Sequence, residues 1–198
     1  MRIGLPKGRL LPHSEVARAL APTGSYSWLL RLQDIPGLVA DGSLDAGITS
    51  EEWIRESRAD VVRLTPLCWY HVRICAIGRP GHPVGPRPRI VSEYPSLAGE
   101  YAQWRHSDAT VRRVHGACEA YVPTLADLAV DCVETGLSMK KSGLDIVEEL
   151  FRGDVWLVCS HETGGDVRRR AELLAWAAGI RHGEAECNWQ REDVHVTA

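Results

Sequence analysis

The sequence has no apolar run long enough to cross a membrane, which excludes a protein built on transmembrane helices. Pro6, Lys7 and Arg9 interrupt the hydrophobic start, so we expect no signal peptide there and a cytoplasmic protein. Excess positive charge is also missing: the formal net charge is −3 over 198 residues, which argues against binding to nucleic acid. These absences favour a soluble enzyme.

A zinc-binding cysteine pattern is absent as well. The chain has six cysteines and no Cys-x-x-Cys pair, the close spacing that structural zinc sites use. Most of the cysteines lie inside hydrophobic runs, as buried free thiols do in a reducing compartment. We therefore predict free thiols and no dedicated metal site.

Hydrophobic content of 44% and charged content of 25% are ordinary for a globular protein, and the length suits one large or two small domains. Strand patterns alternate with helix patterns, which predicts an α/β protein with parallel strands. Strands are predicted at 2–5, 27–32, 45–49, 61–64, 72–77, 89–91, 110–114 and 155–159, with helices near 14–20, 36–42, 50–58, 97–104, 143–150 and 166–178.

The segment from Gly78 to Pro88 is the clearest interruption of this pattern. It contains four prolines and three glycines, so it can form neither a helix nor a central strand. We interpret it as the first crossing between two lobes.

The stretch from Asp131 to Met139 is the most informative in the chain, because it places two acids, a glycine and two hydroxyls between a buried run and an amphipathic run. Backbone N–H groups of a loop that opens a helix can hold a phosphate. Carboxylates beside them can accept hydrogen bonds from ribose hydroxyls or hold Mg²⁺ through water. The alternative is an ordinary capped helix start. The phosphate prediction falls on Gly136, Leu137 and Ser138 for N–H groups, Thr135 and Ser138 for hydroxyls, and Asp131 and Glu134 for carboxylates.

A basic pair, Lys7 and Arg9, flanks Gly8 at the carboxyl end of the first predicted strand. Ligands of α/β sheets collect at the carboxyl ends of strands, so this position favours contact with an anion. A solvated basic pair without a ligand is the alternative.

Six motifs along the chain carry a family resemblance. In order they are 1–11, Arg31-Leu32-Gln33-Asp34-Ile35-Pro36, 42–49, Glu93-Tyr94-Pro95-Ser96-Leu97, 116–120, and Glu134-Thr135-Gly136-Leu137-Ser138-Met139 followed by Ser142-Gly143-Leu144. Together they resemble the short form of ATP phosphoribosyltransferase, the enzyme of the first step of histidine biosynthesis. The resemblance covers about residues 1–158.

This resemblance implies an α/β fold of two lobes with a central cleft, similar to type II periplasmic binding proteins. Residues 1–77 and 156–198 would form the first lobe, and residues 78–155 the second, which carries the phosphate-binding loop. It also implies a homodimer and a separate regulatory subunit related to histidyl-tRNA synthetase, since the chain has no room for the regulatory domain of the long form.

The implied reaction joins phosphoribosyl pyrophosphate (PRPP) to ATP. N1 of the adenine attacks C1 of the ribose, and pyrophosphate leaves with the Mg²⁺ that PRPP carries. Such a reaction needs orientation and charge stabilisation rather than a protein nucleophile. The resemblance assigns the catalytic roles to Lys7, Arg9, Asp131 and Glu134. It assigns substrate binding to Thr135, Gly136, Leu137, Ser138, Arg31, Asp45, Thr49, Arg73, Gly116 and Glu119.

Departures from the family pattern concentrate in the first lobe. Only 22–30 bridges the first helix and Arg31, where relatives have a longer stretch. Ser50 stands where Gly is usual, and the acid that follows it is Glu52. Two further hypotheses therefore stay open beside the ATP-dependent enzyme: a diverged phosphoribosyltransferase with another nitrogenous acceptor, and a non-catalytic two-lobe binding or regulatory protein.

Overall fold

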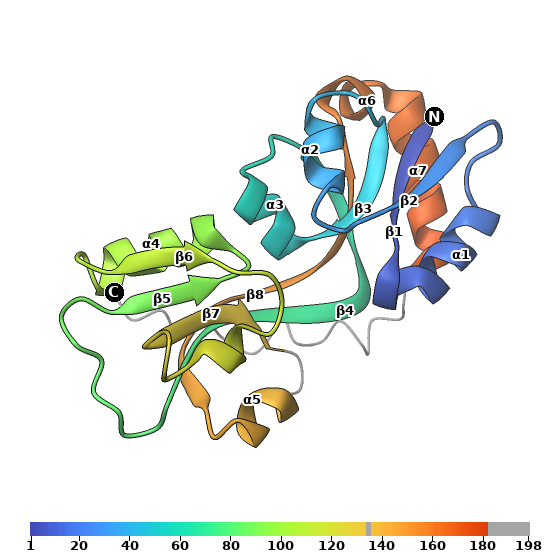
Figure 1. Cartoon of the computed structure of the whole chain (residues 1–198). Coiled ribbons are helices and arrows are strands. Elements are labelled where there is room, and N and C mark those ends of the chain that lie inside the picture. Colours follow the sequence, from blue (N-terminus) through green and yellow to red (C-terminus); the bar gives the residue numbers. More distant parts are fainter. Residues whose placement is uncertain (134–135, 182–198) are drawn as a thin grey trace. The chain divides into compact units, whose positions relative to one another are not determined.

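Residues 1–133 and 136–181 are described by the computed structural model (Figure 1). The chain folds into two units. The first comprises 1–54, 59–70 and the residues from Asp154 onward, and the second comprises 55–58 and 71–153. The chain passes between them along two long strands, β4 (Val62–Gly78) and β8 (Asp145–Cys159), each of which has residues in both units.

The first unit is built on four strands in the order β2-β1-β3-β8. β1 (Arg2–Pro6) pairs in parallel with β2 (Tyr26–Leu30) and with β3 (Ala46–Ser50). The end of β8 runs antiparallel to β3, with Ala46 opposite Cys159. The helices of this unit are η1 (Gly8–Leu10, a 3₁₀ turn), α1 (Leu11–Ala19), α2 (Ile35–Ala40), α3 (Glu51–Ser57), α6 (His161–Gly165) and α7 (Val167–Ile180).

Local sequence explains several helix starts. α1, α2 and α4 (Pro95–Arg105) each carry a proline in the first turn, where a missing N–H costs little. Asp166 caps α7, because its side chain accepts hydrogen bonds from the backbone N–H groups of Arg168 and Arg169.

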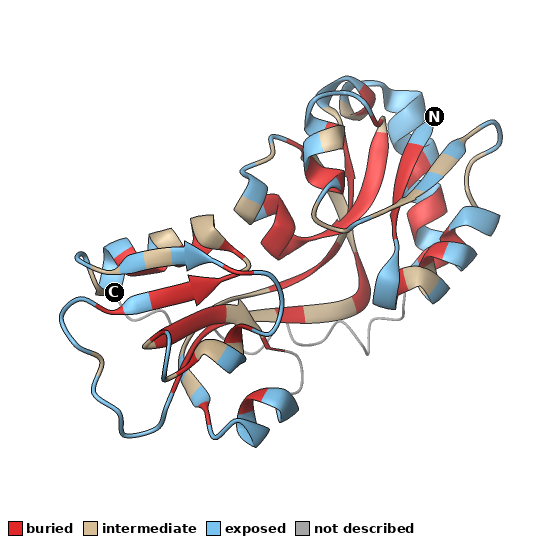
Figure 2. Ribbon diagram, in the orientation of Figure 1, coloured by how far each residue is buried: buried red, intermediate tan, exposed pale blue. Residues whose placement is uncertain are grey.

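β1 and β3 are mostly buried (Figure 2), and side chains that alternate along the strands of the first unit contribute to two hydrophobic clusters. On one side Ile3, Leu5 and Leu157 pack with Leu173 of α7. Another cluster surrounds Ile35 and Val39 of α2, Ile54 of α3 and Val158 of β8. Two tryptophans add hydrogen bonds to this packing. The indole N–H of Trp69 donates to the backbone oxygen of Ile180, and that of Trp176 donates to the backbone oxygen of Ala17.

Two glycines allow α2 to lie directly on the sheet. Gly4 of β1 and Gly47 of β3 are opposite each other in the parallel register. A Cβ at Gly4 would lie 2.7 Å from Leu44 Cδ1, and one at Gly47 would lie 3.3 Å from Val39 Cγ2 and clash with Ile35 Cγ2. The close approach of α2 therefore depends on the absence of side chains at these two positions.

We predict that Gly47→Ala destabilises the protein by about 1–3 kcal/mol, because the added methyl overpacks this contact. Gly99→Ala is the matched control: Gly99 lies inside α4 and a Cβ there meets no atom within 4 Å. That control should be neutral or stabilising by roughly 0.5–1 kcal/mol, since alanine favours helix. Urea unfolding of both variants measures the difference, and equal stability of the two would contradict the packing described.

The second unit contains the strand order β4-β7-β5-β6. β7 (Leu128–Cys132) and β6 (Thr110–Arg113) pair in parallel with β5 (Arg89–Ser92), and β4 is antiparallel to β7. Its helices are α4, η2 (Cys118–Tyr121, a 3₁₀ turn) and α5 (Leu137–Lys141). The core includes Ile77, Val91, Cys118, Ala129 and Met139.

The predicted alternation of strands and helices agrees with this α/β architecture. The two units of the structure meet along the chain at 70/71 and 153/154, and the lobe boundaries at 77/78 and 155/156 stay a prediction. The helix expected near 143–150 is wrong, because 145–150 begin β8, whose backbone pairs with neighbouring strands of the sheet.

Two further observations bear on composition. Cys68 is disulfide-bonded, so the expectation of free thiols is wrong for this residue, whereas Cys75, Cys118 and Cys159 are free thiols. None of the helices in the described ranges has the length and apolar character needed to cross a bilayer.

Candidate functional site

The carboxyl ends of β1, β2 and β3 gather four predicted site residues of the first unit. Pro6 and Leu30 are partners in the register of β1 and β2, so Lys7 and Arg31 follow side by side, and the Lys7 N–H donates to the Leu30 oxygen at 2.8 Å. Thr49, at the end of β3, is fully buried and its hydroxyl donates to the Leu32 oxygen at 2.9 Å. Lys7 and Arg31 are exposed at this edge, whereas Thr49 fixes the chain that follows β2.

Arg9 lies on the 3₁₀ turn that follows β1. Its guanidinium carbon is 4.2 Å from the centre of the Tyr70 ring, and its Nη2 donates to the Tyr70 hydroxyl. A cation over an aromatic face is attracted by the ring quadrupole. Tyr70 therefore holds the guanidinium at the carboxyl edge of β1.

Glu52 is a residue of this edge that the sequence prediction did not include. It lies in the first turn of α3, directly after β3, and its side chain is fully buried. The Ser50 hydroxyl donates to Glu52 Oε1 at 2.5 Å. Burial raises the pKa of the Glu52 carboxyl to about 7, against the opposing hydrogen bonds of Ser50 and its own backbone and the charge of Arg9. A carboxyl with this pKa can change its charge near neutral pH.

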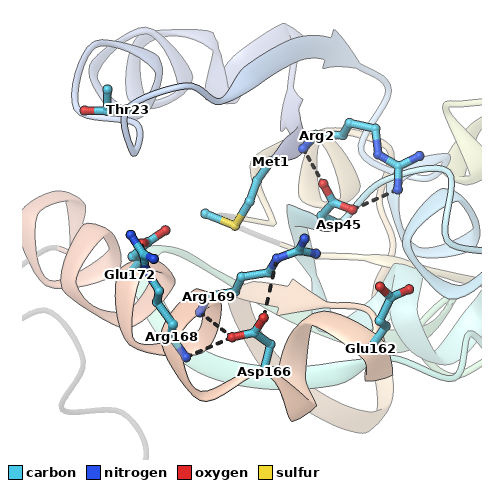
Figure 3. A pocket seen from close by; sticks show the side chains of 9 residues that line it. All are labelled: Met1, Arg2, Thr23, Asp45, Glu162, Asp166, Arg168, Arg169 and Glu172. Carbon is cyan, nitrogen blue, oxygen red and sulfur yellow. Dashed lines mark hydrogen bonds and ion pairs between the residues drawn. The ribbon is translucent and has the colours of Figure 1, made fainter.

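Asp45 lies at the opposite end of β3 from Thr49. Its carboxylate accepts hydrogen bonds from the Arg2 backbone N–H at 2.6 Å and from Arg2 Nη2 at 2.8 Å (Figure 3). The Arg2 side chain holds the pKa of Asp45 below its usual value. The carboxylate of Asp45 is therefore engaged in the ion pair with Arg2, and the substrate-binding role assigned to Asp45 stays a prediction.

A hollow of about 690 Å³ opens beside Asp45, at the amino ends of β1 and β3. Its charged groups largely face one another: Arg168 pairs with Glu172 at 3.3 Å and Arg169 with Asp166 at 3.7 Å (Figure 3). We assign no chemistry to this hollow, because it lies away from the carboxyl ends of the parallel strands and its charges are mutually compensated.

The second unit holds a pocket of about 220 Å³ at the carboxyl end of β7. It brings together four of the predicted residues: Asp131, Gly136, Ser138 and Glu119. The remaining lining comes from Ile77, Cys132, Val133 and Met139. Acid, glycine and hydroxyl groups thus converge in one small pocket, as the sequence pattern predicts for a sugar phosphate.

Asp131 is the central carboxyl of this pocket. Burial raises its pKa, and the negative charges of Glu119 and Glu93 add to that effect. Hydrogen bonds from the Cys132 backbone N–H, at 2.8 Å, and from the Cys118 thiol oppose the shift. The same acid and burial raise the pKa of the Cys118 thiol, which keeps that thiol protonated. The pocket is therefore negative and lacks a cation of its own among its described lining residues.

Gly136 opens the short helix α5 in a left-handed conformation, with φ of 67°. Ser138 is exposed, and Leu137 turns its side chain to solvent with 62% exposure, so Leu137 could serve a ligand through its backbone alone. Glu134 and Thr135, which precede the glycine, lie outside the described residues.

Gly116 and Arg73 are near the pocket without lining it. Gly116, with φ of 65°, and Ala117, with φ of 35°, form the left-handed turn that leads into η2 and so places Glu119. Arg73 accepts the Val133 N–H through its backbone oxygen, while its side chain lies 3.6 Å from Glu149. Arg73 thus contacts the loop after β7 by its main chain.

The described ranges contain no cluster of three or more His, Cys, Asp or Glu residues arranged to hold a metal ion. The two acids of the pocket suit a cation held through water, which requires no closed ligand set.

Among known protein families, the model of one described as ATP phosphoribosyltransferase matches residues 31–177 of this chain. The ATP phosphoribosyltransferase of Desulforudis audaxviator (strain MP104C) is 31% identical over 200 residues, covering 88% of this chain and 69% of the relative.

Solved structures of other proteins share the fold of this chain. A chain of the ATP phosphoribosyl transferase (HisG:HisZ) complex from Thermotoga maritima superposes with a TM-score of 0.82 at 19% identity, covering 91% of this chain and 98% of that one. A histidine kinase sensor domain with similarity to periplasmic binding proteins reaches a TM-score of 0.58 at 12% identity, covering 90% and 88%. These likenesses confirm the predicted fold class.

Proposed function

This chain belongs to the ATP phosphoribosyltransferase family, and we propose that it transfers the phosphoribosyl group of PRPP to N1 of ATP with release of pyrophosphate, the first step of histidine biosynthesis. The observation that carries the proposal is the pocket after β7, where Asp131, Glu119, Gly136 and Ser138 converge. Its size and its mixture of acids and backbone donors suit a ribose 5-phosphate.

PRPP occupies this pocket with its 5-phosphate on the loop that opens α5. Backbone N–H groups from Gly136 to Ser138 and the Ser138 hydroxyl donate to the phosphate, with Thr135 as a further donor. Asp131 and Glu134 accept hydrogen bonds from the ribose hydroxyls. A negative carboxylate beside the ribose also stabilises the positive charge that develops at C1 as the bond to pyrophosphate breaks.

In the transfer step, the N1 lone pair of adenine forms a bond to C1, and the C1–O bond to pyrophosphate breaks with its electron pair leaving on oxygen. Mg²⁺ arrives with PRPP as part of the substrate and neutralises the departing pyrophosphate. Lys7, Arg9 and Arg31 supply fixed positive charge from the carboxyl edge of the first unit, where all three follow neighbouring parallel strands. These cations orient the polyphosphates of ATP or pyrophosphate.

Partners follow from the family. The Thermotoga maritima relative is a HisG:HisZ complex, and we propose by analogy that this chain forms a homodimer that works with a separate regulatory subunit. A biosynthetic role of this kind places the protein in the cytoplasm.

The test is pyrophosphate release from PRPP and Mg²⁺ with ATP, compared with no acceptor, and detection of the adduct by mass. ATP-dependent release with an ATP–phosphoribose adduct supports the proposal. Saturable PRPP binding without an adduct, both alone and with a HisZ-type subunit added, points to another nitrogenous acceptor. Absence of PRPP binding overturns both enzymatic hypotheses.

The left-handed glycine provides a sharper test of the phosphate loop. Gly136→Ala and Gly143→Ala place a Cβ at φ of 67° and 69°, so each should cost about 1–2 kcal/mol of stability. Gly136 lines the pocket whereas Gly143 ends α5 away from it. Steady-state kinetics should therefore show a KM for PRPP raised roughly tenfold in Gly136→Ala, equivalent to about 1.4 kcal/mol, and little changed in Gly143→Ala. Equal KM values would remove Gly136 from the phosphate site.

A further inference from the structure

Arg9 is held by two kinds of contact from one residue distant in sequence, Tyr70. Its guanidinium lies on the Tyr70 ring at 4.2 Å, and its Nη2 reaches the Tyr70 hydroxyl. An arginine side chain alone has many rotamers, and its immobilisation costs free energy when a ligand binds. Tyr70 has already fixed the guanidinium before any anion arrives.

Glu52 lies on the adjacent strand connection. β1 and β3 are neighbouring parallel strands, so η1 with Arg9 and the start of α3 with Glu52 leave the sheet at the same edge. Glu52 is fully buried, and its Oε2 has no hydrogen-bond partner among the residues that the structure describes. A buried carboxyl of this kind influences neighbouring groups through its charge.

Two charged neighbours act on the ionisation of Glu52 in opposite directions. Arg9 of η1 attracts its charged form, and Glu51 of α3 repels it. Glu51 is itself paired with Arg63 of β4 at 3.1 Å. The charge state of Glu52 is therefore coupled chiefly to Arg9.

We propose that Tyr70 and Glu52 are positioning residues for Arg9: Tyr70 fixes its orientation, and Glu52 sets its effective charge toward a bound polyphosphate. This inference rests on the proposed function, in which Arg9 binds pyrophosphate or the ATP phosphates. Each acts through Arg9.

The sign of the pH effect follows from linkage. Below its pKa of about 7 Glu52 is neutral, and the full charge of Arg9 faces the anion. As pH rises through that value, Glu52 ionises and partly offsets Arg9, so anion affinity falls. An ionic interaction of this kind at a partly solvated distance corresponds to a change in affinity on the order of fivefold.

The first experiment measures binding of Mg²⁺-pyrophosphate by calorimetry to the native protein, Tyr70→Phe, Tyr70→Leu and Arg9→Ala. Arg9→Ala should weaken binding strongly. Tyr70→Leu should weaken it roughly fivefold, because it removes a ring contact that contributes on the order of 1 kcal/mol or less and also removes the orientation that the ring gives to the guanidinium. Tyr70→Phe keeps the ring and should recover most of the affinity. Leu and Phe variants that bind equally would overturn the role of the ring.

The second experiment compares the native protein with Glu52→Gln between pH 6 and pH 8. Pyrophosphate itself titrates in this range, but equally for both proteins, so the ratio of their dissociation constants isolates Glu52. That ratio, native over variant, should rise about fivefold with pH. A constant ratio overturns the inference about Glu52.

Arg9→Ala separates a failure of the proposed function from a failure of the roles of Tyr70 and Glu52. If Arg9→Ala binds pyrophosphate as the native protein does, the proposed role of Arg9 falls and the inference falls with it. If Arg9→Ala loses binding while Tyr70→Leu and Glu52→Gln behave as native at every pH, the proposed function stands and the inference alone is overturned.

Discussion

Replacing Asp131 by asparagine is expected to lower kcat/KM for PRPP by about 30-fold to 150-fold, which corresponds to the loss of about 2–3 kcal/mol from a hydrogen bond to a charged group. Asparagine keeps the shape of the side chain and removes the negative charge that accepts from the ribose and stabilises C1. The loss should appear mainly in kcat, since charge at C1 develops in the transition state. Initial rates of pyrophosphate release measure it.

The variant is expected to fold. Burial already raises the pKa of Asp131, so the site disfavours the charged form and tolerates a neutral amide. Asp127→Asn is the matched control: Asp127 directly precedes β7, and its carboxylate pairs with Arg89 at 3.2 Å rather than lining the pocket. Native-like kcat/KM in Asp131→Asn, with a normal circular dichroism spectrum, would contradict the assignment.

The same carboxyl predicts the acid limb of the pH profile. Because the pKa of Asp131 is raised, its protonation begins at higher pH than for an ordinary aspartate, and activity should decline on that side sooner. Loss of this limb in Asp131→Asn is part of the expected result.

Sequence pattern was sufficient for the parts of the site that lie close together along the chain. Lys7 follows β1, and Asp131 and Gly136 surround one strand end, so local order already placed them. The structure brings Glu119 to the same pocket from a different part of the chain. Strand ends and short loops are read directly from the sequence, because their geometry is fixed by neighbours within a few residues.

The other features of the site could not be predicted, because they depend on packing between residues that are distant in the sequence. Arg9 and Tyr70 are 61 positions apart in the sequence, and no sequence periodicity predicts their contact. The full burial of Glu52 depends on how α3 packs against the sheet. The contact of Asp45 with Arg2 depends on the register of β3 with β1, and the substrate-binding role of Asp45 stays a prediction. The prediction of a helix near 143–150 was wrong, because the strand β8 is favoured there by its pairing with neighbouring strands of the sheet.

The buried Glu52 gives the second large expectation. The pKa of Glu52 is raised from 4.5 to about 7 in the folded protein. Below pH 4.5 both folded and unfolded states are protonated and the site carries no penalty. Between these values the unfolded chain ionises while the folded one stays protonated, so the native protein loses stability as pH rises, by about 3 kcal/mol in total. Above pH 7 the loss is complete and constant.

Glu52→Gln removes this titration. Its amide keeps an oxygen for the Ser50 hydroxyl but buries an N–H₂ where Oε2 has no partner, which adds a cost that does not vary with pH. The informative quantity is therefore the stability of the variant minus that of the native protein, which should rise by about 3 kcal/mol between pH 4 and pH 8. Urea unfolding at half-unit steps of pH measures it.

Glu172→Gln serves as the control, since Glu172 is an exposed acid on α7 paired with Arg168. Its difference from the native protein should stay nearly flat, because surface ion pairs contribute little. Parallel curves for Glu52→Gln and the native protein would show that Glu52 ionises at its ordinary pKa, and would remove the physical basis for its coupling to Arg9. A difference that rises through pH 4.5–7 would instead establish that the carboxyl edge of the first unit holds an acid whose charge depends on conditions near neutrality.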